Sequence, residues 1–243
     1  MQTDKLRFPS GRSVANCKKD AKRLCKTDRI PLHEALDRVS ADNGLAMPFH
    51  LAITQLKKQA ARFMMTHADI QAVMDKHPEL THFGIGLYRR TAEKMTESEY
   101  AISFEKERQS LLEAVDECNR ACHFLKHMQK RQTINTASSS YGLKHRAEAF
   151  GRRMEEDNPY VANGALICAA IHLGFEFKQG LNDSPNVWFN TSNRSPVVQW
   201  ERLKDRANSL YAYSKKQDNK LAMLEKQLGF PNPHQPMIIE CYH

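Results

Sequence analysis

One stretch near the middle of the chain is apolar around almost its whole circumference when it is read as a helix. Ten of the thirteen residues from 161 to 173 are Val, Ala, Leu, Ile or Cys. A surface helix would show a polar stripe, so other elements must surround this one. Gly164 would let a second backbone approach closely, and Gly174 suits a left-handed helix end. The turn at Asp157-Asn-Pro159 predicts where this helix begins.

The rest of the chain favours a mainly α, multi-helix fold with one small β-hairpin. Gly and Pro number only ten each in 243 residues, and alternating apolar patterns are scarce. Two alternating aromatic pieces, 175–178 and 187–190, flank a polar loop and predict the hairpin. Helix, turn, helix and hairpin is the order of a winged-helix DNA reader, which predicts a winged-helix-like central module.

The helical patterns and their breaks divide the chain into six predicted segments. They are a flexible arm (1–12), a basic two-helix head (13–44), a helical core with one long helix at 96–128 (45–130), the helix-turn-helix and hairpin module (131–195), one long C-terminal helix (196–230) and an extended tail (231–243). The two long helices carry apolar residues three and four apart, so they could pair with each other or with a second copy.

The same patterns predict a cytoplasmic protein without a membrane partner. No apolar run reaches the roughly 18–20 residues of a membrane span, and the first residues lack the apolar core of a signal peptide. The cysteines are therefore expected to be reduced thiols. They are Cys17, Cys25, Cys118, Cys122, Cys168 and Cys241.

Positive charge is concentrated in two blocks. Residues 1–30 hold nine Lys/Arg against three Asp/Glu, and residues 126–153 hold seven against one, within a net charge of +8. Such blocks are typical of proteins that bind nucleic acid, with DNA favoured over RNA, although two solvated basic faces are the alternative. The second helix of the central module is apolar, so the basic first helix, the serine loop before it and the hairpin are the predicted contact surface. The predicted contacts are Lys18, Lys19, Lys22, Arg23, Lys26, Lys130, Arg131, Ser138, Ser139, Tyr141, Lys144, His145, Arg146, Arg152, Arg153 and Lys178.

Two enzyme interpretations compete with binding. Cys118 and Cys122 share a helix face, but His123 and His127 point away from it, which favours core thiols over a zinc site. His145, between two cations and after three serines, has the residue types of a metal-independent phosphodiesterase. Its spacing does not favour cleavage over binding. We therefore predict no catalytic residue, no metal and no cofactor.

Two parts of the chain resemble uncharacterised proteins of bacterial plasmids and integrative elements. They are residues 13–44, with Pro31-Leu-His-Glu-Ala-Leu-Asp-Arg-Val39 followed by Asn43-Gly44, and residues 131–192. The resemblance implies a mobile genetic element and assigns no chemistry. The resulting hypothesis is a non-enzymatic nucleic-acid-binding protein with a regulatory or maintenance role. The alternatives are a protein-interaction subunit of a defence or counter-defence assembly and, third, a small nuclease.

Overall fold

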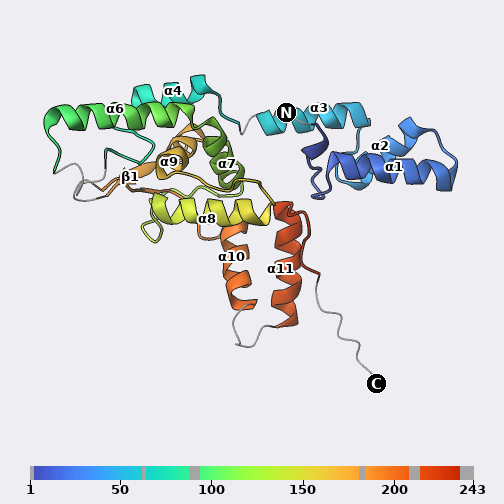
Figure 1. Cartoon of the computed structure of the whole chain (residues 1–243). Coiled ribbons are helices and arrows are strands. Elements are labelled where there is room, and N and C mark those ends of the chain that lie inside the picture. Colours follow the sequence, from blue (N-terminus) through green and yellow to red (C-terminus); the bar gives the residue numbers. More distant parts are fainter. Residues whose placement is uncertain (1–2, 62–63, 88–93, 181–183, 208–213, 236–243) are drawn as a thin grey trace. The chain divides into compact units, whose positions relative to one another are not determined.

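The computed structural model describes residues 3–61, 64–87, 94–180, 184–207 and 214–235 (Figure 1). The chain divides into two compact units, one made of residues 1–62 and 196–243 and the other of residues 63–195. The fold is mainly helical with one small two-stranded antiparallel sheet, which confirms the predicted class. Within the described residues, no helix is both long and apolar enough to cross a membrane.

The central unit, residues 63–195, is built around its apolar helix. Its helices are α4 (His67–Lys76), α6 (Glu97–Glu113), α7 (Val115–Leu125), α8 (Ser140–Arg153) and α9 (Asn163–His172), and its strands are β1 (Phe177–Gln179) and β2 (Val187–Phe189). Helix α9 contacts α4, α7 and α8, which enclose it (Figure 1). Every residue from Asn163 to Ala170 is buried. The predicted burial of this helix is confirmed.

The first turn of α9 touches the loop that follows α4. A Cβ atom placed on Gly164 would lie 1.8 Å from the carbonyl oxygen of Thr81 and 2.7 Å from that of His82. The Gly164 N–H donates to the same His82 oxygen at 2.9 Å. Beside it, the Asn163 amide donates to the carbonyl oxygens of Phe83 and Pro185. Glycine is therefore required at 164 because two backbones meet there.

Two predicted helix boundaries in this unit were wrong. Helix α9 begins at Asn163 and not at Pro159, because side-chain acceptors hold the N–H groups of residues 160–162 in an extended segment. The predicted helix 96–128 is two helices that meet at Ala114, whose ψ is 38°. The second of them, α7, turns so that Cys118, Ala121 and Leu125 pack in the core with α9.

The hairpin and the order of elements around it match the prediction, but the role of the second helix differs from that in a winged-helix reader. Strands β1 and β2 pair with Phe177 opposite Phe189. Residues 131–139 run along the free edge of β2, where the Asn135 N–H donates to the Phe189 carbonyl oxygen. Helix α9, which such a reader would place in the DNA groove, is the core of the unit. The predicted boundary at residue 131 lies inside this unit.

The other unit begins with the head. After the short 3-10 helix η1 (Thr3–Lys5) come α1 (Val14–Asp28), α2 (Leu32–Asp42) and α3 (Phe49–Ala61), and Ser13 caps α1. The predicted flexible arm is instead packed: Phe8 is buried against Phe49, and the Val14 N–H donates to the Leu6 carbonyl oxygen at 2.8 Å. An aromatic ring that completes a small core explains why this segment joins the head.

The predicted long C-terminal helix is a pair of helices, α10 (Pro196–Ala207) and α11 (Lys215–Leu228). Ser214 and Gln217, which interrupt the apolar seam, form the capping box that starts α11. The indole N–H of Trp200 donates to Glu225 at 2.9 Å, so the start of α10 lies beside the end of α11. Residues 208–213, most of the predicted tail and its Cys241 lie outside the described residues.

The contact at Gly164 gives a test of the core. Gly164→Ala should lower the free energy of unfolding by about 3 kcal/mol or more, because the added methyl group meets backbone that cannot move aside. A helical Gly-to-Ala change normally stabilises by about 1 kcal/mol. Gly142→Ala in α8 is the matched control, since a Cβ there meets only the rotatable Ser138 hydroxyl. Urea unfolding followed by circular dichroism measures both; equal stability of the two variants would contradict the packing.

Candidate nucleic-acid interface

The two units differ in charge. Residues 63–195 hold 16 Lys/Arg and 17 Asp/Glu, a net charge of −1, and the other unit holds 20 and 11, a net charge of +9. The basic block at 126–153 is thus balanced by acidic residues of its own unit. The excess positive charge belongs to the unit that contains the head.

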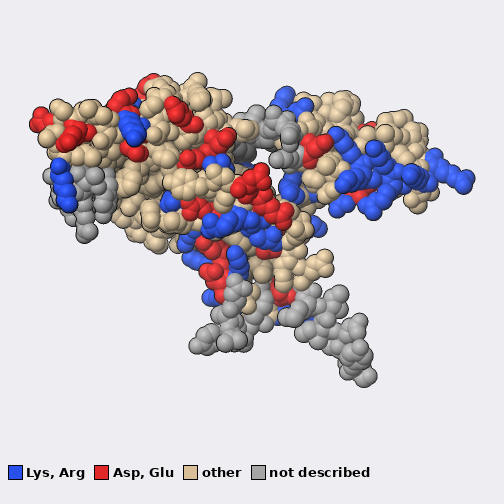
Figure 2. All heavy atoms as spheres, viewed as in Figure 1, with Lys and Arg blue, Asp and Glu red and all other residues tan. Residues whose placement is uncertain are grey.

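Within the head, most of the uncompensated charge lies along one face of α1. Figure 2 shows Lys and Arg side chains gathered over this helix. Lys19, Lys22 and Lys26 are exposed, and their spacing of three and four places them on one helix face. We call them the α1 lysine row. The opposite face buries Val14, Cys17 and Ala21. Among the described residues, none of the three ammonium groups has a carboxylate partner.

Two predicted contacts that flank the row have acidic partners. The Lys18 ammonium lies 2.7 Å from Asp4, and the Arg23 guanidinium pairs with Asp20. Asp20 also accepts a hydrogen bond from Arg12, which, with the Arg23 contact, lowers the pKa of its carboxyl group. Exposed pairs of this kind contribute little free energy and exchange readily with other anions. Lys18 and Arg23 therefore add less uncompensated charge than the row itself.

The predicted nucleic-acid contact at Lys144 needs correction, because this side chain is buried and not available to a phosphate. Only 8% of the residue is exposed, and its ammonium lies 2.9 Å from the Glu148 carboxylate one helical turn later. Burial acts to raise the pKa of Glu148, but hydrogen bonds from Lys144 and His145 outweigh it, so the pKa is lowered. The spacing of four between Lys144 and Glu148 was the sequence signal for this pair.

Two tyrosine rings lie close to the Lys144 ammonium, and the His145 ring lies beside one of them. It lies 5.6 Å from the ring centre of Tyr141 and 5.1 Å from that of Tyr160. The His145 ring meets Tyr141 edge to face at 4.6 Å, and its Nδ1 lies 3.0 Å from Glu148. Tyr141 and Tyr160 are 52% and 49% exposed. We call Tyr141, His145 and Tyr160 the ring surface. Tyr160 was missed in the sequence, where nothing distinguishes an exposed tyrosine from a core one.

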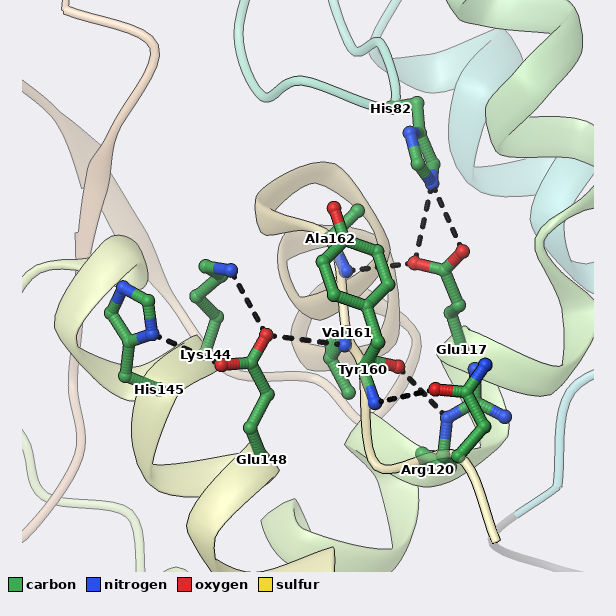
Figure 3. A network of polar contacts seen from close by, with 10 residues as sticks. His82, Glu117, Arg120, Lys144, His145, Glu148, Tyr160, Val161 and Ala162 are labelled. Carbon is green, nitrogen blue, oxygen red and sulfur yellow. Dashed lines mark hydrogen bonds and ion pairs between the residues drawn. The ribbon is translucent and has the colours of Figure 1, made fainter.

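Two carboxylates hold the extended segment before α9 (Figure 3). Glu148 accepts from the Val161 N–H, and Glu117 holds the next residue, Ala162. Glu117 of α7 accepts from the Ala162 N–H at 2.7 Å and lies 3.2 Å from His82 Nε2. The hydrogen bond that His82 donates to Glu117 raises the pKa of His82. Burial acts to raise the pKa of Glu117, but the contacts with His82 and Ala162 outweigh it and lower the pKa. Arg120 donates to the Tyr160 carbonyl oxygen at 2.9 Å, so the Tyr160 backbone is held from both sides.

The remaining predicted contacts of the central unit do not form one cluster. Ser139 caps α8 and pairs with Trp188, which pairs in turn with the exposed Lys178, so Ser138, Ser139 and Lys178 lie near the start of α8. Arg152 and Arg153 end the same helix, about 18–20 Å away along its axis.

The predicted cations outside these two groups have partners in the fold. Lys130 donates to the Leu173 carbonyl oxygen beyond α9 and lies over the Phe175 ring. Arg131 bonds Thr133, and Arg146 makes other contacts within the protein, as does Arg153 at the end of α8. Lys130 therefore helps to hold the fold, whereas the Arg131 side chain makes a local contact on the surface.

The two thiols of α7, and the histidines His123 on this helix and His127 just after it, lie in or beside the core. Cys118 and Cys122 are fully buried, and burial raises the pKa of the Cys122 thiol to about 12. Burial lowers the pKa of His127 to about 3, and His123 bonds Glu156. Among the described residues, no three His, Cys, Asp or Glu side chains are grouped so that they could hold a metal ion.

Comparison with protein-family models, with curated proteins and with solved structures gives no match.

The His82–Glu117 pair predicts how stability depends on pH. Its contribution is full between about 4.5 and 6.5, the ordinary values for the two groups. It is lost as pH falls through the lowered pKa of Glu117, and lost again as pH rises through the raised pKa of His82. Glu117→Gln should cost about 1–2 kcal/mol inside this window and less on either side. Urea unfolding over a pH series measures it; the exposed Glu105→Gln should show no such window, and a pH-independent cost for Glu117→Gln would exclude the charged pair.

Proposed function

We propose that this protein binds nucleic acid, DNA in preference to RNA, and that the α1 lysine row makes the main phosphate contact. The observation that carries the proposal is a row of three exposed ammonium groups without carboxylate partners, in a unit of net charge +9. Binding of this kind is driven by the release of counterions from the phosphates. It needs no catalytic group, and the proposed role is regulatory or one of maintenance.

The length of the row suits a nucleic-acid backbone. Lys19 and Lys26 are seven residues apart, about 10 Å along the helix axis. Phosphates of one strand recur about every 3.4 Å along a duplex axis, so the row matches the rise of about three phosphates. Lys18 and Arg23 flank it and can exchange their exposed acidic partners for phosphate.

In this proposal, the central unit faces the nucleic acid with a different surface from the one that a standard winged-helix reader uses. The start of α8, the serines before it and the hairpin would face the nucleic acid, while α9 stays in the core. This winged-helix-like arrangement, and a place on a plasmid or integrative element, are supported by the order of the elements and by the resemblance of residues 13–44 and 131–192.

The proposal predicts a specific loss of affinity. Replacing Lys19, Lys22 and Lys26 by Ala should weaken duplex binding about 10-fold or more at moderate salt, since neutralised phosphates supply much of the affinity. The slope of log affinity against log salt should flatten by up to about 2.7, at about 0.9 for each phosphate that the variant no longer neutralises. Fluorescence anisotropy with a labelled duplex over a salt series measures both quantities.

The matched control changes the same number of charges elsewhere in the same unit. Lys215, Lys216 and Lys220 of α11 are exposed and, among the described residues, have no carboxylate partner. Their triple Ala variant should bind like the natural chain. Equal losses of affinity in the two variants would mean that the α1 lysine row contributes only to the general charge of the protein. Absence of binding, together with a partner that survives nuclease treatment in a pull-down, would favour the assembly-subunit alternative; cleavage abolished by His145→Ala would favour the nuclease.

A further inference from the structure

We propose that the ring surface, Tyr141, His145 and Tyr160, is a stacking site for unpaired bases, so that the central unit selects single-stranded or locally unwound nucleic acid. The inference rests on the proposed function and deepens it by naming the form of nucleic acid. The head would supply attraction to any phosphate backbone, and the central unit would supply the preference for unpaired bases.

The first argument is exposure. Tyr141 and Tyr160 are the two most exposed aromatic side chains among the described residues, and both lie within 6 Å of one ammonium group. Phe83 and Tyr100 of the same unit are less exposed, at 39% and 36%, and Phe124, Phe150 and Phe189 are buried. Two half-exposed rings gathered at one point of a well-packed unit offer aromatic surface to solvent, and bases stack on aromatic side chains.

The second argument is that the rings are held in place before any ligand arrives. The Lys144 ammonium contacts both tyrosine rings and is itself fixed by Glu148. The Tyr160 backbone is bonded on both sides, by Asn158 through its N–H and by Arg120 through its carbonyl oxygen (Figure 3). Side chains that are already ordered lose less conformational entropy on binding, so more of the stacking energy appears as affinity.

The third argument is charge. With a net charge of −1, the central unit has no strong general attraction for a duplex backbone. Stacking does not depend on such attraction, because every base has a π face. An exposed cation is still present: Lys178 lies near the start of α8, whereas Lys144 is buried beside the rings and paired with Glu148. This combination fits an exposed base with its adjoining phosphate better than it fits a duplex.

The test compares three probes of one sequence: a single strand, its duplex, and the same single strand with abasic sites throughout, each in deoxy and ribo form. Tyr141→Leu/Tyr160→Leu should weaken single-strand binding about 10-fold or more, as expected when base-aromatic stacking is removed. Binding of the duplex and of the abasic strand should not change, because these probes offer no unpaired base. Tyr141→Phe/Tyr160→Phe should keep single-strand affinity, since the rings remain. Fluorescence anisotropy at constant salt gives all of these affinities.

Tyr100→Leu in α6 is the matched control, because Tyr100 is also an exposed tyrosine of the central unit and stacks on Phe104. Thermal unfolding of each variant separates misfolding from loss of the site, and the Phe pair stays informative if the Leu pair unfolds. Equal losses of affinity on all three probes, or no loss on the single strand, would overturn the inference while leaving the proposed function standing. Failure of the natural chain to bind any probe would instead remove the proposed function.

Discussion

The central unit depends on two carboxylates that hold the backbone just before its core helix. Glu148 of α8 accepts from the Val161 N–H, and Glu117 of α7 accepts from the Ala162 N–H. An extended segment that enters a core has backbone donors that must be satisfied, because an unpaired buried N–H costs roughly 1–3 kcal/mol. Glu148 is buried and Glu117 is half-buried, so each needs partners of its own: Lys144 and His145 contact Glu148, and His82 contacts Glu117.

The need of Glu148 for a partner also determines where the candidate site lies. Lys144 is drawn inward by Glu148, and the exposed rings of Tyr141 and Tyr160 lie around its ammonium. A residue that could have met a phosphate thus becomes the support of an aromatic surface. The energetic reason is that a buried carboxylate without a partner costs more than a surface cation gains by remaining in solvent. The ring surface results from the way in which the extended segment before α9 is held. The inference about unpaired bases follows from that packing.

Charge is organised by unit rather than by sequence block. The head keeps three lysines on one face of α1 without acidic partners, whereas the cations of residues 126–153 are balanced within the central unit. Long-range attraction depends on uncompensated charge, whereas base stacking depends on exposed aromatic rings. Attraction to phosphate and recognition of bases would therefore be divided between two units, each suited to one of them by its charge.

The sequence by itself determined the mainly helical class, the hairpin and the burial of α9, because periodicity is a local property. It also placed the α1 lysine row, since exposure there follows from amphipathic spacing. Only the tertiary structure decided that α9 starts at Asn163, that the helix predicted at 96–128 breaks at Ala114, that Lys144 is buried and that Tyr160 is exposed. Each of these depends on a partner distant in the chain or on a backbone contact that no local pattern encodes.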